Sequence, residues 1–265
     1  MKPDSESGPV IDLNADIGEA ADEPGIAVEA ALAGIVTSVN IACGGHAGDA
    51  ESMRRAIEWA LADGCAIGAH PSYPDRAGFG RTPLDVSAED LTALLIDQIG
   101  ELARIAEASG TCLSHVKPHG ALYHDASEAE SVAEAVLAAA RAVDPGVLLF
   151  GAAGSPAVGW WSGRGGDCVH EAFADRVYER DGRLRSRDLP GALVGSARAA
   201  AAQARSIAAE RHVVAADGTR IGIAAGSICL HADTPGALAM AEAVANELRA
   251  AGIALRAPSR GPSGR

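Results

Sequence analysis

The segment HVKPHGALYH, residues 115–124, places three histidines around Lys117 within ten positions. Of the 22 lysines and arginines in the chain only two are lysines, and the other is Lys2. A lysine ammonium is compact and its pKa responds to its surroundings, whereas arginine stays charged and suits a plain ion pair. We therefore expect Lys117 to contact a developing negative charge or a substrate carboxylate, rather than to form only a structural ion pair.

Five other predicted strand ends also carry ionisable or amide side chains. They are Asp12, Asn14, Asp16 and Glu19; Asn40, His46 and Asp49; His70, Asp75, Arg76 and Arg81; Glu171, Asp175 and Arg176; and His231 and Asp233. Any one of them could be a cap or a structural hydrogen-bonding group, and Asp12 or Asn14 could satisfy groups inside a barrel. Burying charges at six strand ends without a use would be costly, so the pattern predicts an active site.

The elements that position these residues alternate regularly. Short apolar segments with β-branched residues predict strands at 10–14, 35–42, 65–70, 112–117, 147–151, 168–174, 227–231 and 253–257. Alanine-rich segments of helical period predict helices at 48–63, 87–109, 127–142, 196–210 and 235–251. Alternation predicts an α/β fold with a parallel sheet, and seven or eight such units favour a closed or nearly closed TIM-like barrel.

Two segments depart from this alternation of strands and helices. Residues 174–194 and 213–225 each contain an Asp-Gly turn and lack a helical period, so we expect a hairpin or an excursion at each. We expect residues 1–265 to form a single barrel domain, ordered over about 10–257, with flexible tails at 1–8 and 258–265.

Composition limits the function. The net charge is −13 and no basic stripe occurs, which argues against nucleic-acid binding. No apolar run is long enough for a membrane helix and the start of the chain is polar, so we expect a cytoplasmic protein. The five cysteines form no CxxC motif and are expected to be buried free thiols, with a nucleophilic Cys43 the less favoured alternative.

Common catalytic motifs are missing or weak. The chain has neither a GxxxxGK[ST] phosphate loop nor a GxSxG elbow, so a nucleotide would have to be bound in another way or by another chain. Asp16, His46 and His70 could hold a zinc or Fe(II)-like ion, but no HxxxH or HExxH spacing places a pair of histidines on one predicted helix, so the support for a divalent metal is weak.

Six segments together carry a resemblance: IDLNADIGEA, VNIACGGHAGD, IGAHPSYPDRAGFGR, HVKPHGALYH, EAFADR and ICLHAD. In this order, over about residues 10 to 255, the chain resembles the LamB/YcsF family. The resemblance implies an irregular (β/α)7-type barrel of the glycoside hydrolase/deacetylase kind. It also implies the A subunit of a 5-oxoprolinase, which opens the lactam 5-oxo-L-proline to L-glutamate with ATP as co-substrate. Partner subunits B and C would use the ATP to activate the lactam.

That chemistry suggests roles for the strand-end residues. Water needs a base, for which Asp16 or His46 is expected, oriented by Asp49 or Glu19. The ring nitrogen needs an acid, for which His70 or His119 is expected. Lys117 with Arg81 or Arg176 would hold anionic oxygens. The substrate-binding residues are expected to be Asn14, Asn40, Arg81, Arg176, His231 and Asp233.

Three positions depart from the family pattern, and two other functions stay open. Gly45 stands where the family usually has an aromatic residue, which could enlarge the pocket or loosen the loop that bears His46. Val177 and Ser186 stand where glycine and proline are usual, which could alter the first hairpin. The alternatives are a stand-alone metal-dependent amidohydrolase or deacetylase, and a non-catalytic subunit that delivers a ligand.

Overall fold

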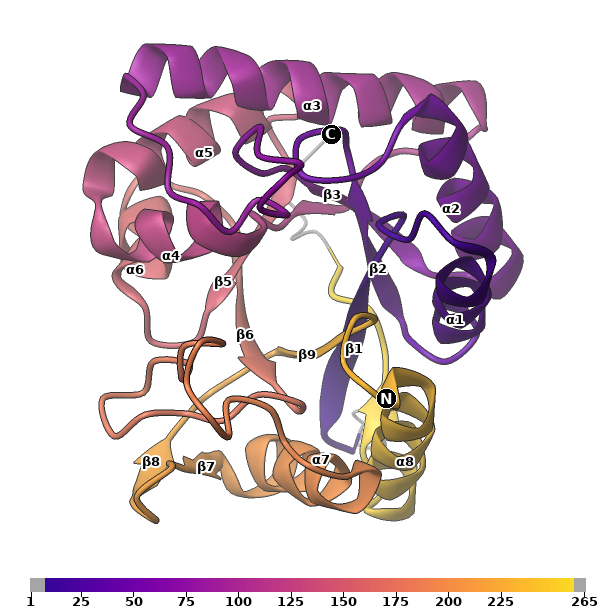
Figure 1. Ribbon diagram of the computed structural model, residues 1–265, viewed down its shortest axis with the longest axis vertical. Helices are drawn as coiled ribbons and strands as arrows, with labels where there is room; N and C mark the ends of the chain where they lie inside the picture. Colours follow the sequence, from indigo (N-terminus) through magenta and orange to yellow (C-terminus); the bar gives the residue numbers. More distant parts are fainter. Residues whose placement is uncertain (1–7, 260–265) are drawn as a thin grey trace, which may run out of the picture.

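A closed barrel of seven parallel strands forms the centre of the molecule (Figure 1). The computed structural model describes residues 8–259. In barrel order the strands are β1 (Val10–Ile17), β2 (Ser38–Ala42), β3 (Ala66–His70), β4 (His115–Val116), β5 (Leu148–Ala152), β6 (Cys168–Phe173) and β9 (Ser227–His231), and β9 pairs again with β1. The expected irregular seven-stranded barrel is confirmed.

Helices surround this barrel (Figure 1). They are α1 (Glu23–Ala33), α2 (Ala50–Asp63), α3 (Ala88–Ala108), α4 (Gly120–Glu128), α5 (Glu130–Val143), α6 (Pro156–Gly163), α7 (Ala197–Arg205) and α8 (Ala237–Ala250), and a π-helical turn, η1 (Ser206–Glu210), extends α7. The longest, α3, begins where Ser87 caps the backbone N–H of Asp90. Among the described residues, no helix has the length and apolar character needed to cross a bilayer.

Strand β1 shows how the barrel presents polar groups. Leu13 and Ala15 belong to the main hydrophobic core, whereas the alternating Asp12, Asn14 and Asp16 hydrogen-bond to residues of other barrel strands. All five side chains are buried, because both faces of a barrel strand are covered. The interior of the barrel is therefore polar along this strand, and its polarity continues to the carboxyl end.

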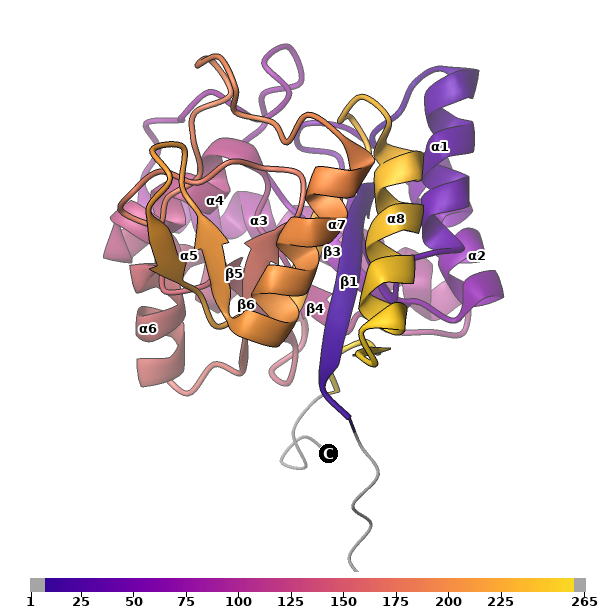
Figure 2. The same cartoon turned by 90° about the horizontal axis from the view of Figure 1, so that it is seen from below.

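Both expected excursions are present. The segment 174–194 folds back on itself through antiparallel bridges between Arg176 and Leu193 and between Tyr178 and Leu184. The second is the hairpin of β7 (His212–Val214) and β8 (Arg220–Gly222). Seen from the side, long loops gather at the end toward which β1 points (Figure 2).

Some element predictions were wrong in extent. Helices α1 and α6 were not predicted, because Pro and Gly near their starts resemble turn residues (Pro24, Gly25, Pro156 and Gly159). The predicted helix 127–142 corresponds to α5 and the last two residues of α4, which an extended backbone at Ala129 separates; the rest of α4 was not predicted. Strand β4 is shorter than predicted, although Ser114 and Lys117 still donate to β3 on either side of it.

The last predicted strand is not a barrel strand. It is β10 (Ala254–Leu255), which pairs with the first residues of β1 at the edge of the sheet. The flexible tails that we expected lie largely outside the described residues.

The five cysteines are free, as expected. Three of them are buried, but Cys112 is exposed and Cys168 is partly so, which corrects the expectation that all are buried. Burial raises the pKa of Cys43 to about 12, so its thiol stays protonated at neutral pH.

Candidate active site

Lys117 lies at the centre of the polar cluster and is 2% exposed. Its Nζ is 2.9 Å from Glu171 Oε1, 3.1 Å from Asp16 Oδ1, 3.2 Å from Asn14 Oδ1 and 3.0 Å from Cys229 Sγ. Burial lowers the pKa of Lys117, but the charges of Asp16 and Glu171 outweigh it and hold the pKa well above its usual range. The ammonium thus keeps two buried carboxylates together, and a contact with substrate stays a prediction.

A layer of amides and hydroxyls lies below this lysine. Asn14 Nδ2 donates to Glu171 Oε1 at 2.9 Å, and Asn40 Nδ2 donates to Asn14 Oδ1 at 2.7 Å and to Asp16 Oδ1 at 2.8 Å. Tyr123 donates its hydroxyl proton to the second oxygen of Glu171. Asn14 and Asn40 use their side-chain amides for these bonds inside the barrel. They thereby hold the carboxylates of Glu171 and Asp16 in place.

Asp16 and His70 lie side by side at the carboxyl ends of β1 and β3. Asp16 Oδ2 is 3.4 Å from His70 Nε2, and His70 Nδ1 is 2.7 Å from the backbone oxygen of Lys117. Burial raises the pKa of Asp16, but the neighbouring His70 and Lys117 together lower it well below its usual range. Asp16 is therefore ionised.

Glu19 and His46 form a second acid–base pair. His46 Nε2 is 2.9 Å from Glu19 Oε1, and His46 Nδ1 is 3.0 Å from Ser72 Oγ. Ser72 donates its own proton to the backbone oxygen of Tyr73, so it accepts from His46 Nδ1. Burial and Asp16 raise the pKa of Glu19 to about 8, and burial and His70 lower that of His46 to about 3. One proton is shared between Glu19 and His46 Nε2.

His119 stacks on His46, with 3.7 Å between the ring centroids. Its Nε2 is 2.9 Å from the backbone oxygen of Phe79 and its Nδ1 is 3.0 Å from His70 Nε2. Phe79 adopts a left-handed φ of 55°, which is unfavourable for a side chain of this size. The following Gly80 permits the close packing, because a Cβ there would lie 2.8 Å from His46 and 2.9 Å from His119.

His231 is oriented by a buried carboxylate. Its Nδ1 lies 3.0 Å from Asp175 Oδ2, which also accepts from the backbone N–H of His231 and from Thr234 Oγ1. Burial raises the pKa of Asp175, but these partners lower it to about 2. The ionised Asp175 accepts a hydrogen bond from Nδ1–H, so Nε2 is the ring nitrogen that faces away from this carboxylate.

Arg176 is a buried cation without a counter-charge in contact. It is 4% exposed, and no ion pair involves it among the described residues. Nη2 donates to the backbone oxygen of Arg185 at 2.7 Å, whereas Nε has no hydrogen-bond partner within residues 8–259. Burial and the nearby Arg187 lower its pKa to about 10. A buried, incompletely bonded guanidinium indicates a place for an anion.

Arg81 and Asp233 join the loops above the barrel. Asp233, after β9, forms ion pairs with Arg81, after β3, and with Arg187 of the 174–194 excursion. These side chains are 25–41% exposed, so the pairs lie at the surface and are individually weak. They connect three segments that are far apart in the sequence.

Some predicted site residues lie elsewhere. Asp49 accepts from the backbone N–H groups of Glu51 and Ser52 and caps α2, so it does not orient His46. Asp12 is held by Thr37, Ser38 and Ser227 deeper in the barrel.

Sequence reasoning did not assign site roles to three residues that contact the cluster: Ser72, Tyr123 and Glu171. Their position within the same six segments was the available signal, although Ser72 resembled a turn residue.

Two groups of neighbouring side chains at this end of the barrel could bind a metal ion. Asp16, Glu19, His70 and His119 each offer a ligand atom, and these atoms lie within 4.8 Å of one another. His46, expected as the third ligand, lies beside this group and bonds to Glu19. A second group, Asp16, Cys229 and His231, meets the same limit, but the Lys117 ammonium lies 3.0 Å from Cys229 Sγ and would repel a cation there.

Of the three departures from the family pattern, Gly45 lies in a well-packed place, Val177 is partly buried and Ser186 is exposed. A Cβ at Gly45 would overlap Ser72 Oγ and Gln98 Oε1, so these two side chains fill the space that we expected to be open. Val177 hydrogen-bonds to Ala192 and Arg185 within the excursion. Ser186 bonds with Asp188 at its turn.

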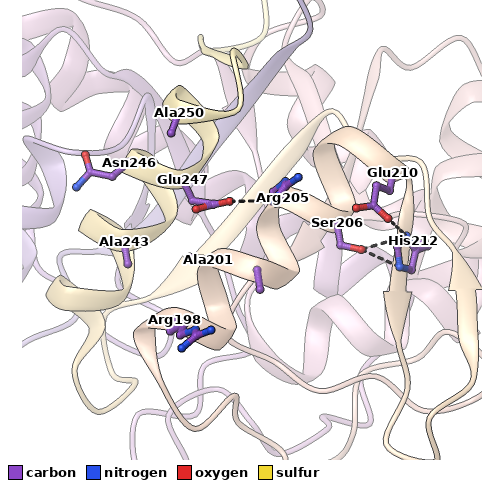
Figure 3. Close-up of a pocket in the computed structure, with 11 residues that line it drawn as sticks. Arg198, Ala201, Arg205, Ser206, Glu210, His212, Ala243, Asn246, Glu247 and Ala250 are labelled. Atoms are coloured by element: carbon purple, nitrogen blue, oxygen red, sulfur yellow. Dashed lines mark hydrogen bonds and ion pairs between the residues drawn. The ribbon is translucent and has the colours of Figure 1, made fainter.

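An exposed groove lies outside the barrel, between α7 and α8 (Figure 3). Five of its polar side chains pair with one another: Arg205 with Glu247, and His212 with Ser206 and Glu210. No residue predicted for the site lines it. We therefore place the candidate site at the carboxyl ends of the strands, where the buried acid–base groups converge.

Comparisons with known proteins agree with this architecture. Residues 11–262 match the LamB/YcsF family model. The chain is 45% identical over 247 residues to the 5-oxoprolinase A subunit of Mycobacterium avium (strain 104), covering 93% of this chain and 98% of that relative. It is 46% identical over 248 residues to the 5-oxoprolinase A subunit of Chloroflexus aggregans, covering 94% and 98%. The crystal structure of a lactam utilization protein from Thermus thermophilus superposes with a TM-score of 0.87 at 37% identity, covering 94% of this chain and all of that one. The chain belongs to the LamB/YcsF family.

Proposed function

We propose that this chain acts as the A subunit of an ATP-dependent 5-oxoprolinase and opens the ring of 5-oxo-L-proline to give L-glutamate. The names of relatives at about 45% identity and near-complete coverage support the subunit role. The observation that carries the chemistry is the convergence of buried acid–base pairs, Glu19 with His46 and Asp175 with His231, at one end of the barrel.

Opening a lactam requires activation, because resonance makes the amide carbon a poor electrophile. In the proposed reaction, partner subunits B and C use ATP to phosphorylate the lactam oxygen. Water then adds to the activated carbon, the C–N bond breaks and the ring nitrogen takes up a proton, which leaves a glutamyl phosphate. A second water releases glutamate and phosphate. This division of labour suits a chain that has no phosphate loop.

The two acid–base pairs supply the proton transfers. His231 Nε2 acts as the base for water, because Asp175 holds the opposite nitrogen in its protonated form. The proton that Glu19 and His46 share is delivered to the ring nitrogen. The Asp175–His231 pair thus acts at the carbon of the C–N bond, and the Glu19–His46 pair acts at its nitrogen.

Substrate recognition falls to Arg176. A guanidinium that is 4% exposed, with an unbonded Nε, is ready to receive the carboxylate of 5-oxoproline. Arg81 and Arg187 lie close enough to lower the pKa of Arg176, and their positive charges add to the field around its guanidinium.

Reconstitution tests this function. The purified chain, subunits B and C, 5-oxoproline and ATP are combined, and glutamate is measured with each component left out in turn. Glutamate is expected only in the complete mixture. Formation without this chain would overturn the proposal, and activity of this chain alone without ATP would favour a stand-alone amidohydrolase.

A further inference from the structure

We propose that Asp16, His70 and His119 bind one divalent transition-metal ion at the carboxyl end of the barrel, with Glu19 beside its open coordination position. This inference goes beyond the proposed function, because ion binding does not depend on which substrate the site accepts. It follows from the tautomers of two histidines and from the spacing of their neighbours.

The backbone fixes the tautomers. His70 Nδ1 is 2.7 Å from the Lys117 carbonyl oxygen, and His119 Nε2 is 2.9 Å from the Phe79 carbonyl oxygen. A carbonyl can only accept, so each of these nitrogens carries a hydrogen. In a neutral imidazole the other nitrogen then holds a lone pair, which is His70 Nε2 in one ring and His119 Nδ1 in the other.

These two remaining nitrogens face each other at 3.0 Å. Two lone pairs at this separation repel unless a proton or a cation lies with them. The rings are 1% and 7% exposed, so water does not screen the repulsion. Metal-binding histidines in general are oriented in the same way, because the ring N–H on the far side from the metal donates to a backbone carbonyl or a carboxylate.

A carboxylate supplies the third ligand. Asp16 Oδ1 is occupied by Asn40 and Lys117, whereas Oδ2 is 3.4 Å from His70 Nε2. Ligand atoms at about 2.1 Å from one ion, with angles of about 90–110°, are about 3.0–3.4 Å apart. The separations of 3.0 Å between His70 and His119 and of 3.4 Å between His70 and Asp16 match that spacing, and the ligand atoms of the three residues lie within 4.8 Å of one another.

Glu19 lies beside the coordination position that the three ligands leave open. Its Oε1 is 3.5 Å from His119 Nδ1 and 3.9 Å from His70 Nε2, but only 2.9 Å from His46 Nε2. Because His46 already holds this oxygen, we assign Glu19 to the open position rather than to the ligands. Two imidazoles and one carboxylate favour zinc, iron(II), cobalt or manganese over calcium or magnesium. An ion there would lower the pKa of a bound water.

Metal titration of the full-length chain tests the site. The chain is dialysed against a chelator and titrated with Co²⁺ and Zn²⁺, following the Co²⁺ absorption spectrum and the heat of binding. One ion per chain is expected. D16N and H119Q should each weaken binding at least about 100-fold, since each removes a ligand. E19Q and H212Q, a histidine outside the cluster, should bind within about tenfold of the unmodified chain.

The outcomes separate a metal ion from a proton. No saturable uptake, or equal uptake by H119Q, would overturn the inference and indicate that a proton bridges the two rings. Circular dichroism of each variant shows whether it is folded before its binding is compared. Because the readouts are spectroscopic and calorimetric, their result is independent of glutamate release by the complex.

Discussion

Replacing Arg176 with methionine is expected to stabilise the free chain while weakening substrate binding. Lowering the guanidinium pKa from its usual range to about 10 corresponds to about 3 kcal/mol against the charged form. Methionine removes this cost and keeps apolar volume, but loses the bond from the charged guanidinium to the Arg185 oxygen, worth about 1.5–3 kcal/mol. We expect the free energy of unfolding of the free chain to rise by up to about 1.5 kcal/mol.

The same change should remove the partner of the substrate carboxylate. Truncating one side of a buried charged pair costs about 2–5 kcal/mol, so KM for 5-oxoproline should rise at least about 30-fold. Unfolding in urea and glutamate release by the reconstituted complex measure the two effects. R183M is the matched control, because Arg183 belongs to the same excursion but its side chain is 69% exposed. A less stable R176M chain with an unchanged KM would refute the reasoning.

Three further changes test other parts of the account. K117M should lower the free energy of unfolding by about 3–5 kcal/mol, because Asp16 and Glu171 lose their shared cation; a urea midpoint near that of the unmodified chain would contradict this. D175N should lower kcat at least about 100-fold by releasing His231. The pKa of Asp175 lies below 3.8, so its stabilisation is complete above that pH and is lost toward about pH 2; D175N should lose this part of the acid sensitivity, measured as urea midpoints from pH 2 to 6. G45A should destabilise by about 1–3 kcal/mol through overlap with Ser72, whereas G100A, on an open face of α3, should not.

The sequence was sufficient to predict the barrel and the face that carries the site. Parallel strands place their carboxyl ends together, so the strand-end positions of Asp16, His70 and Lys117 implied that they meet. The structure brings all three within direct contact of one another or of a shared neighbour. This part depends only on strand order and direction, which alternating strands and helices indicate.

The pairing of the side chains was not predictable in the same way. Whether His46 meets Glu19 or Asp49 depends on the path of the loop after β2, and Asp49 is drawn away by the start of α2. Helix α1 was not predicted because Pro24 and Gly25 resemble a turn, although the Asp22 side chain caps them. Local patterns do not contain these tertiary choices.

Lys117 illustrates the difference between recognising a residue and assigning its role. Its rarity indicated importance, yet its four acceptors come from positions as far away as Asn14 and Cys229. With three N–H groups facing Asp16, Glu171, Asn14 and Cys229, it stabilises the carboxylates of the site in the structure.

The central claim is that the strand-end cluster opens the activated lactam, and glutamate release by the complete complex with H231Q tests it most directly. H231Q removes the proposed base, whereas H212Q changes a histidine outside the cluster and serves as control. Size-exclusion chromatography verifies that each variant still assembles with subunits B and C. The account predicts at least about a 100-fold lower rate for H231Q and an unchanged rate for H212Q. A fully assembled H231Q complex that releases glutamate at the unmodified rate would contradict it.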